Sequence, residues 1–332
     1  MKKEKVLIVG AGLSGLYTAL LLQERYEIIV IEARDRLGGR VYSVEGHDMG
    51  PSWVWEHQEH ILALIKSLDL EIFEQYTQGL ALYDAPDGIQ KFTPPPATSY
   101  RVRGGISAIL NALEKKLTDS IHFTEVLKEL KEVGNHVSVH TSQNDYLVDK
   151  VILTMPPRLC AESVFYSPDL PLEPRTDLMN VPTWMGYVTK CVIEYPRAFW
   201  RDEGLSGLTF SPLGPLGEIH DACLEGRAAL FGFAQTKANN DSLEEDIIKQ
   251  LTRLYGDIAS KPTQVYIKLW HKDIYTASHQ DSHALNEHPK YGFESQHFSG
   301  KILFSGTESA FDEGGYLEGS LVSSLESTKY LI

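Results

Sequence analysis

Three glycines and an acid near the N-terminus have the residue types and the spacing of a phosphate-binding site. The glycines are Gly10, Gly12 and Gly15, and they directly follow the apolar run Val6–Val9. The first permits a tight turn, the second lets a backbone approach a pyrophosphate, and the third lets a helix pack closely on a strand. A second apolar run ends at Glu32, whose carboxylate could accept hydrogen bonds from ribose hydroxyls. This order of strand, glycine turn, helix, strand and acid predicts a dinucleotide-binding βαβ unit.

The elements that must position these residues are predicted from hydrophobic periodicity and turn signals. Further helices are expected at 59–69, 104–117, 243–255 and from about 317. Further strands are expected at 121–126, 136–140, 146–154, 187–195, 264–270 and 301–305. Residues 158–182 are rich in proline and predict an irregular connection, and residues 203–218 are rich in glycine and proline and predict turns.

The two ends of the chain carry the nucleotide-binding features, whereas the middle mixes strands with one long helix. This organisation predicts an α/β protein in which a Rossmann-like cofactor domain, assembled from separated segments, accepts an inserted α+β substrate domain. We assign residues 1–75, 101–156 and 271–332 to the cofactor domain. Residues 76–100 and 157–270 are then the substrate domain.

Composition and charge narrow the classes of partner. The formal charge of −14 argues against nucleic acid and anionic membranes, and it fits either a generic acidic cytoplasmic protein or one that attracts a cationic substrate. The sequence holds no run of about 18 apolar residues, which predicts no membrane span. No targeting segment is recognised, so a cytoplasmic location is expected. Cys160, Cys191 and Cys223 are too few and too widely spaced to predict disulfides or a metal cluster.

A histidine-rich segment after residue 270 is the one candidate for metal binding. His279, His283 and Glu287 have a spacing that would place them on one helix face, where they could bind a metal. Asp281 and Pro289 disfavour a continuous helix there. We therefore expect no metal and interpret the segment either as a solvated loop or as one that supports the site residues from behind.

Three segments resemble the flavin-containing amine oxidases, the monoamine oxidase-like FAD flavoproteins. Residues 32–40, Glu-Ala-Arg-Asp-Arg-Leu-Gly-Gly-Arg, resemble their FAD-binding extension. Gly306-Thr-Glu308 with Gly314-Gly-Tyr316-Leu-Glu-Gly319 resembles their C-terminal flavin motif, and Gly186-Tyr-Val-Thr-Lys190-Cys-Val with Phe199-Trp200-Arg201 resembles their substrate-domain strand. The matches follow the family's order, so the chain is identified as a shortened member.

The resemblance implies FAD as cofactor, held in a three-layer Rossmann-like domain of the glutathione-reductase and amine-oxidase type. Arg34 and Arg40 would neutralise the pyrophosphate. Val126 would meet the adenine through its backbone, Glu308 would lie near the diphosphate or the ribityl chain, and the amides that begin the last helix would point at the flavin pyrimidine ring. The full set of expected cofactor-binding residues is Gly10, Gly12, Leu13, Ser14, Gly15, Glu32, Ala33, Arg34, Gly38, Gly39, Arg40, Val126, Gly306, Glu308, Gly315, Tyr316 and Leu317.

Lys190 is the first candidate catalytic residue. Val188, Lys190 and Val192 share one face of a strand. A lysine between two valines is either an edge residue that discourages aggregation or an inward functional group, and the strand by itself favours the first interpretation. The resemblance favours the second, since the family places a lysine here, bonded through water to the flavin N5, where it assists oxygen chemistry.

The expected substrate pocket departs from the family pattern. Tyr316, the second candidate catalytic residue, matches one of two aromatic side chains that hold the substrate against the flavin, and Gln280 takes the place of the other. His279 stands where some members carry a cysteine joined to the flavin, which predicts non-covalent FAD. Only residues 76–100 replace a long helical insertion, so a smaller substrate domain and a more open cavity are expected. The predicted pocket residues are Trp53, Trp270 and Gln280.

These features predict an FAD-dependent oxidoreductase that oxidises an amine C–N bond. Hydride transfer to flavin N5 would give an imine, and O2 would reoxidise the flavin with release of H2O2. The alternatives are an FAD-dependent desaturase or oxidase of a larger hydrophobic substrate, and a non-catalytic binding module on the same fold. The expected partners are a small molecule and O2, and the oligomeric state stays open.

Overall fold

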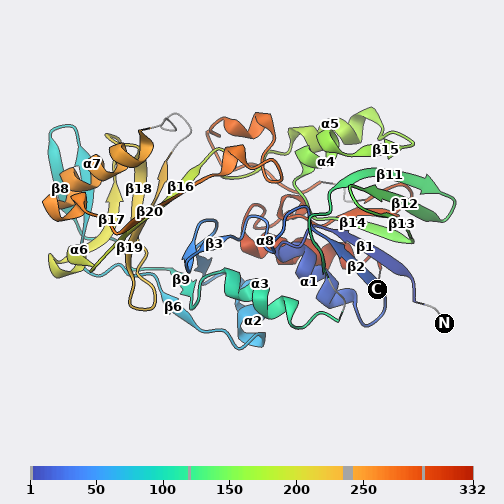
Figure 1. Cartoon of the computed structure of the whole chain (residues 1–332), viewed down its shortest axis with the longest axis horizontal. Coiled ribbons are helices and arrows are strands. Elements are labelled where there is room, and N and C mark those ends of the chain that lie inside the picture. The colour runs from blue at the N-terminus through green and yellow to red at the C-terminus, as the bar shows by residue number, and fades with distance from the viewer. Residues whose placement is uncertain (1–2, 119–120, 235–241, 294–295, 332) are drawn as a thin grey trace.

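Figure 1 shows the protein, as a computed structural model, to be an elongated molecule built from two parts that lie side by side. The structure describes residues 3–118, 121–234, 242–293 and 296–331. Both ends of the chain lie in the same part, on the right of Figure 1. This part is therefore built from segments far apart in the sequence.

A six-stranded sheet forms the centre of this part, in the order β10-β2-β1-β14-β22-β21. Its strands are β1 (Lys5–Val9), β2 (Glu27–Ile31), β10 (Ile121–His122), β14 (Lys150–Leu153), β21 (Gln296–His297) and β22 (Ile302–Phe304). All neighbours pair in parallel except β21 with β22. Since both faces of a parallel sheet are covered, its strands are continuously apolar, as Val6, Leu7 and Ile8 of β1 illustrate by being fully buried.

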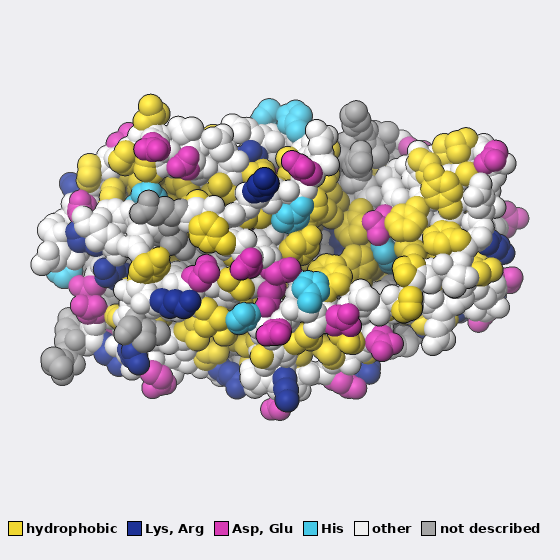
Figure 2. Space-filling view, turned by 180° about the vertical axis from the view of Figure 1, so that it is seen from behind, with side chains coloured by type: hydrophobic (Ala, Val, Ile, Leu, Met, Phe, Trp, Pro, Cys, Tyr) yellow, Lys and Arg dark blue, Asp and Glu magenta, His cyan; other side chains and the backbone are white. Residues whose placement is uncertain are grey.

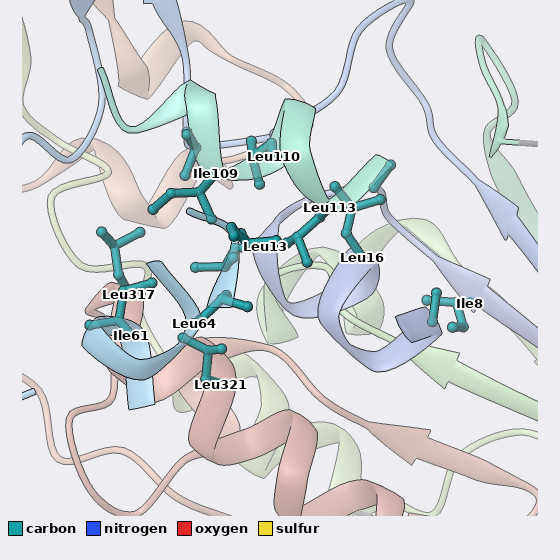
Figure 3. Close-up of a cluster of buried hydrophobic side chains, with 14 of the residues drawn as sticks. Ile8, Leu13, Leu16, Ile61, Leu64, Ile109, Leu110, Leu113, Leu317 and Leu321 are labelled. Carbon is teal, nitrogen blue, oxygen red and sulfur yellow. The ribbon is translucent and has the colours of Figure 1, made fainter. Parts of the chain in front are cut away.

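Four helices pack together over one face of this sheet (Figure 3). They are α1 (Leu13–Leu22), α2 (Glu59–Ser67), α3 (Ser107–Glu114) and α8 (Leu317–Thr328). Figure 3 shows Leu13 and Leu16 of α1 meeting leucines and isoleucines from the other three helices. This cluster fixes the start of α8 beside the glycine turn that precedes α1.

The opposite face of the sheet is covered by a four-stranded sheet in the order β13-β12-β11-β15 and by two helices. These elements are β11 (Leu127–Val133), β12 (His136–Thr141), β13 (Asp145–Val148), β15 (Phe165–Ser167), α4 (Pro157–Ser163) and α5 (Leu172–Asn180). Helices, parallel sheet and outer sheet make three layers. The predicted α/β fold with a Rossmann-like domain is confirmed.

The other part is built on a seven-stranded sheet in the order β20-β16-β19-β18-β17-β7-β8. Its strands are β7 (Leu80–Ala85), β8 (Gly88–Phe92), β16 (Thr189–Tyr195), β17 (Leu205–Phe210), β18 (Leu216–Asp221), β19 (Ala228–Ala234) and β20 (Gln264–Leu269). The helices α6 (Phe199–Asp202) and α7 (Leu243–Tyr255) pack on one face. Among the described residues, no helix has the length and apolarity required to cross a bilayer.

The remaining elements are short, and most of them lie where the two parts meet. They are β3 (Ser43–Val44), β4 (His47–Asp48), β5 (Val54–Trp55), β6 (Ile72–Glu74), β9 (Ser99–Val102), and the 3-10 turns η2 (Asp257–Ser260), η3 (Trp270–Lys272), η4 (His279–Ser282) and η5 (Thr307–Ser309). β5, β9 and β6 form a small sheet of their own. Residues 47–55 run from β4 to β5 and bring the cofactor domain to the seven-stranded sheet.

Four secondary-structure predictions are wrong. The predicted strand 121–126 is a strand only at residues 121 and 122, which form β10. Residues 158–182 are not irregular, because Pro157 occupies the first turn of α4 and Pro171 precedes α5, positions where proline begins a helix rather than breaking one. Residues 203–218 contain all of β17 and the first half of β18. The predicted strand 146–154 is interrupted at Asp149, whose carboxylate accepts a hydrogen bond from Lys5 N at 2.7 Å.

The predicted division into domains stays a proposal, and the two largest sheets are compatible with it. Strands of the six-stranded sheet all come from the assigned cofactor segments, and strands of the seven-stranded sheet all come from residues 76–100 and 157–270. Residues 157–180, however, pack into the same hydrophobic cluster as β1 and β14. We propose that the substrate domain resumes after residue 180 rather than at 157.

Candidate active site

The glycine turn between β1 and α1 has the shape of a phosphate cradle. Gly10 has a φ of +106°, and a Cβ on Gly15 would lie 1.9 Å from the carbonyl oxygen of Gly10, so only glycine fits at both places. A Cβ on Gly12 would meet only Gly38, at 3.7 Å from its carbonyl oxygen. Leu13 and Ser14 then begin α1, whose first amides have no partners within the helix. The turn can therefore present N–H groups to a pyrophosphate.

Substituting Gly15 by alanine is expected to abolish retention of FAD, because the new methyl group would push the turn away from α1. The measurement is the ratio of flavin absorbance to protein after purification. Gly217→Ala is the matched control, since nothing lies within 4 Å of a Cβ there. A Gly15→Ala protein that keeps a full complement of flavin would contradict the proposed cradle.

A glycine pair, Gly38 and Gly39, lies against the glycine turn that precedes α1. Gly38 N donates to Ala11 O at 2.9 Å, and Gly38 and Gly39 both have positive φ angles, +103° and +55°. Gly12 and Gly38 form an isolated parallel bridge. The predicted residues of the two glycine segments therefore lie together, although more than twenty residues separate them in the sequence.

Glu32 lies at the end of β2 and is buried. Its carboxylate accepts hydrogen bonds from Ala11 N at 2.8 Å and from Arg34 N at 2.9 Å. These bonds orient both oxygens and leave each with further acceptor capacity. Ala33, the next residue, is half-buried. The arrangement fits an acid that receives ribose hydroxyls.

Arg40 and Glu308 form a bidentate ion pair between segments 268 residues apart. Arg40 Nη2 donates to Glu308 Oε2 at 3.0 Å, and Nη1 donates to Oε1. The Glu308 side chain is fully buried, whereas 28% of the Arg40 side chain is exposed. The remaining N–H groups of Arg40 can therefore bind a phosphate while Glu308 holds the guanidinium in place.

Arg34 lies in a different environment from Arg40. Its guanidinium donates to Asp273 Oδ1 and to Thr276 Oγ1, the latter at 2.9 Å, and its Nη1 is 3.6 Å from Glu32 Oε1. Asp273 already balances its charge. The contact of Arg34 with the pyrophosphate stays a prediction. In the structure, the Arg34 side chain joins the N-terminal motif to residues 273–276.

Val126 is close to the strand end that carries Glu32, because Glu125 N donates to Glu32 O at 2.8 Å. The backbone of Val126 is already bonded to Ser142: its N–H donates to the Ser142 hydroxyl at 2.9 Å, and its carbonyl accepts from Ser142 N at 2.8 Å. The carbonyl keeps a second lone pair for an adenine amino group. The predicted contact with adenine stays a prediction.

The C-terminal motif is fixed by Thr307. Its hydroxyl accepts from Gly315 N at 2.9 Å and donates to Tyr316 O at 2.8 Å. Gly315 has a φ of +85°, and Tyr316 is the extended residue before α8, which begins at Leu317 as predicted. Ser14 Oγ donates to Ser320 O at 3.2 Å, so α1 and α8 begin side by side. Gly306, before η5, lies next to the buried Glu308.

Lys190 is buried in the middle of β16 with 2% of its surface exposed. Its Nζ donates to Gly50 O at 2.7 Å and to Ser52 Oγ at 2.5 Å, and it lies 4.4 Å from the centre of the Phe231 ring. Burial lowers the pKa of the Lys190 amine to about 7, with Asp48 acting to raise it and Arg101 to lower it further. Lys190 therefore points inward, and the interpretation as an edge residue is wrong.

A row of aromatic rings connects Lys190 with Tyr316. Trp53 packs at 5.1 Å from Phe231 and at 6.2 Å from Trp55, and Trp55 meets Tyr316 edge to face at 5.5 Å. Trp270 lies on the other side of the same segment, where its Nε1 donates to Met49 O at 2.8 Å. The structure thus brings Trp53 close to Lys190 and places Trp270 against residues 47–55.

Gln280 lies on the exposed turn η4. The ring that stacks on Tyr316 is that of His288, with centroids 5.1 Å apart and planes 4° from parallel. His288 also lies 4.7 Å from Trp184. A pocket role for Gln280 stays a prediction, and His288 is the side chain that covers the face of Tyr316.

Sequence reasoning missed three residues of this region: Asp48, Arg101 and His288. Asp48 and Arg101 are almost fully buried charges near Lys190, and His288 covers Tyr316. Asp48 and Arg101 belong to no recognisable motif, and only their burial reveals them. His288 follows the His279, His283 and Glu287 spacing, which was interpreted as a possible metal site and gave no sign of a contact with Tyr316.

The residues present fit FAD. The cradle admits a pyrophosphate, Glu32 and Arg40 supply the ribose acceptor and the phosphate donor, and the start of α8 supplies amides beside them. Figure 2 shows a hollow between the two parts of the molecule, with hydrophobic side chains around it and acidic side chains nearby. A separate surface groove of about 630 Å³ lies between α1, α2 and α8 and includes none of the predicted site residues. The fold and the site define an FAD-dependent oxidoreductase.

Comparison with known proteins narrows the class further. Residues 74–332 match the model of the family described as flavin containing amine oxidoreductase, and residues 8–68 match an NAD(P)-binding Rossmann-like domain. The chain belongs to the flavin containing amine oxidoreductase family. Pig amine oxidase [flavin-containing] B is 22% identical over 95% of the chain and 84% of the relative. Its alignment spans 436 positions, so the relative carries segments that this 332-residue chain lacks.

Further relatives and solved structures are also flavin-containing or amine oxidases by name. A probable flavin-containing monoamine oxidase A of Dictyostelium discoideum is 27% identical over 69% of this chain and 52% of its own length. A putrescine oxidase bound to putrescine has a TM-score of 0.87 at 20% identity and covers 99% of both chains. Cyclohexylamine oxidase from Brevibacterium oxydans has a TM-score of 0.84 at 17% identity, with 99% and 98% covered. These structures share the fold.

Proposed function

We propose that the protein oxidises the C–N bond of a small amine to an imine, with O2 as the electron acceptor and H2O2 as the second product. Bound FAD supplies the hydride-accepting N5 and the reaction with O2. The observation that carries the proposal is the buried amine of Lys190, held by Gly50 and Ser52 at the junction of the cofactor domain with the seven-stranded sheet. Family membership supports the substrate class.

We further propose a role for each of the two candidate catalytic residues. Tyr316, fixed before α8 by Thr307 and Trp55, presents an apolar ring that would orient the carbon next to the substrate nitrogen. Lys190 would place a titratable amine beside the flavin, where it favours the negative charge that develops on O2. The formal charge of −14 would attract ammonium substrates toward the hollow. The putrescine oxidase of similar fold binds putrescine, an amine, which supports the same substrate class.

Non-covalent attachment of FAD is part of the proposal. Covalent attachment through sulfur requires a reactive thiolate. Burial raises the pKa of the Cys191 thiol to about 12 and that of Cys223 to about 11, and it raises the pKa of Cys160 as well. All three thiols therefore stay protonated at neutral pH. Denaturation is expected to release the flavin completely into the supernatant.

The test of the function is an anaerobic titration of the purified yellow protein with a panel of amines, followed by the visible flavin spectrum. Bleaching by an amine, with one equivalent of imine formed and H2O2 released after air is admitted, is the expected result. A protein that no amine bleaches would contradict the proposal. Bleaching by a large hydrophobic substrate instead would favour the desaturase alternative.

A further inference from the structure

Three buried charges cluster behind the candidate active site. Lys190 is held by Gly50 and Ser52, and Asp48 lies two residues before Gly50 on the same segment. Arg101, on β9, forms an ion pair with Asp48, with Nη2 at 3.8 Å from Oδ2. Each of the three side chains is buried almost completely. The cluster therefore contains one carboxylate and two cations, all shielded from solvent.

The two carboxylate oxygens of Asp48 have different partners: one accepts hydrogen bonds and the other faces a cation. Its Oδ1 accepts from Ile106 N at 2.9 Å, just before α3, and from the Ser43 hydroxyl at 3.1 Å. Its Oδ2 faces Arg101. Burial raises the pKa of the Asp48 carboxyl, and Lys190 and Arg101 both act to lower it. Asp48 thus ties the segment that holds Lys190 to the start of α3.

The burial of the Arg101 guanidinium is not explained by packing alone. Within the described part of the chain, its Nε is a buried atom without a hydrogen-bond partner. The distance of 3.8 Å to Asp48 is an ion pair but too long for a hydrogen bond. Burying a guanidinium under these conditions destabilises the fold. Buried charges whose placement costs stability cluster at functional sites.

We propose that Asp48 and Arg101 are positioning residues that set the charge of the Lys190 amine, Asp48 by favouring its cation and Arg101 by opposing that effect. The proposal rests on the proposed role of Lys190 at the flavin. Removing Arg101 leaves Asp48 to Lys190 alone, so the lysine keeps its proton to higher pH. Removing the charge of Asp48 leaves Lys190 facing only a cation, so it loses its proton at lower pH.

Other titratable groups near Lys190 are already paired. Lys268 is the register partner of Lys190 on β20, and its Nζ donates to Asp273 at 2.7 Å. His220, on β18, stacks on Phe231 at 5.2 Å and bonds Glu218 at 2.6 Å. β19 presents Phe233 opposite Lys190. Asp48 and Arg101 are therefore the charges that act on Lys190 most directly.

The test is an NMR titration of lysine isotope-labelled at the ε-carbon, in the flavin-loaded and the flavin-free protein. The signal of Lys190 is assigned by its loss in Lys190→Met. We expect Arg101→Met to move the titration midpoint up and Asp48→Asn to move it down, each on the order of one pH unit. Arg101→Lys keeps the charge and should restore the wild-type midpoint.

Arg253→Met is the matched control. Arg253 pairs with the buried Asp84 on β7, which is separated from β16 by three strands of the same sheet, so the Lys190 midpoint should not move. Asp48→Asn keeps an acceptor for Ile106 N, and cooperative thermal unfolding checks that each variant is folded. Midpoints that stay fixed, or that move in the same direction in both variants, would overturn the proposal. A third outcome separates the two proposals. If the Lys190 midpoint moves in opposite directions in the two variants but the pH profile of O2 consumption does not move with it, the proposed role of Lys190 at the flavin is contradicted. The effect of Asp48 and Arg101 on the Lys190 midpoint would then still hold.

Discussion

Lys190→Met is expected to react with O2 about 10²–10³-fold more slowly than the wild type once the flavin is reduced, while reduction by the amine changes much less. The magnitude is that of losing one group aimed at developing charge in a buried site. Burial places the pKa of Lys190 at about 7, so the cationic form, which favours electron transfer to O2, is lost as the pH rises through 7. Stopped-flow measurement of the rate at which O2 reoxidises the reduced flavin, between about pH 5 and about pH 9, gives both the loss of rate in Lys190→Met and the pH dependence in the wild type.

The same substitution should change how stability depends on pH. The folded pKa of Lys190 is about 7, and an unfolded lysine titrates near 10.5. Between these values the unfolded chain binds one more proton, so wild-type stability should rise by about 1 kcal/mol per pH unit relative to Lys190→Met. Below pH 7 both states are protonated and the difference becomes constant. Urea unfolding of the two flavin-free proteins provides the comparison, and a flat difference from pH 7 to 10 would show that Lys190 is not buried as a titrating amine.

Arg40→Met is expected to cost about 3–5 kcal/mol of unfolding free energy, because it leaves a charged, fully buried Glu308 without its bidentate partner. Flavin retention should be lost as well, since the phosphate donor is gone. Chemical denaturation and the flavin-to-protein ratio are the measurements. Arg103→Met, which breaks the exposed pair with Glu71, is the control and should cost about 0–1 kcal/mol.

A double variant separates the two consequences of losing Arg40. Arg40→Met combined with Glu308→Leu removes both buried charges, so most of the stability should return. Flavin binding should not return, because no guanidinium remains at the phosphate site. Recovery of flavin in the double variant would show that Arg40 serves Glu308 alone and does not bind the cofactor.

Much of the cofactor site could be predicted from the sequence, because its parts are local. The glycine turn, the helix that follows and the acid at the end of β2 depend on φ angles and on close approach within about thirty residues. The start of α8 at Leu317 was also predicted, and it is confirmed. The predictions that failed, at 158–182 and 203–218, treated proline and glycine as breakers where they begin helices and join short strands.

The amino-acid sequence by itself determined the family and the cofactor, and it predicted the FAD-binding residues and Lys190 and Tyr316 as candidates, since motifs of adjacent residues encode them. Only the tertiary structure decided what surrounds them. Whether Lys190 lies inside, and which charges act on it, depends on the neighbours that β4 and β9 bring to β16. Arg40 likewise meets Glu308, 268 residues away, only because the fold brings the second glycine segment beside η5. Electrostatic effects in a buried site depend on distance and on exclusion of water, and spacing along the chain encodes neither.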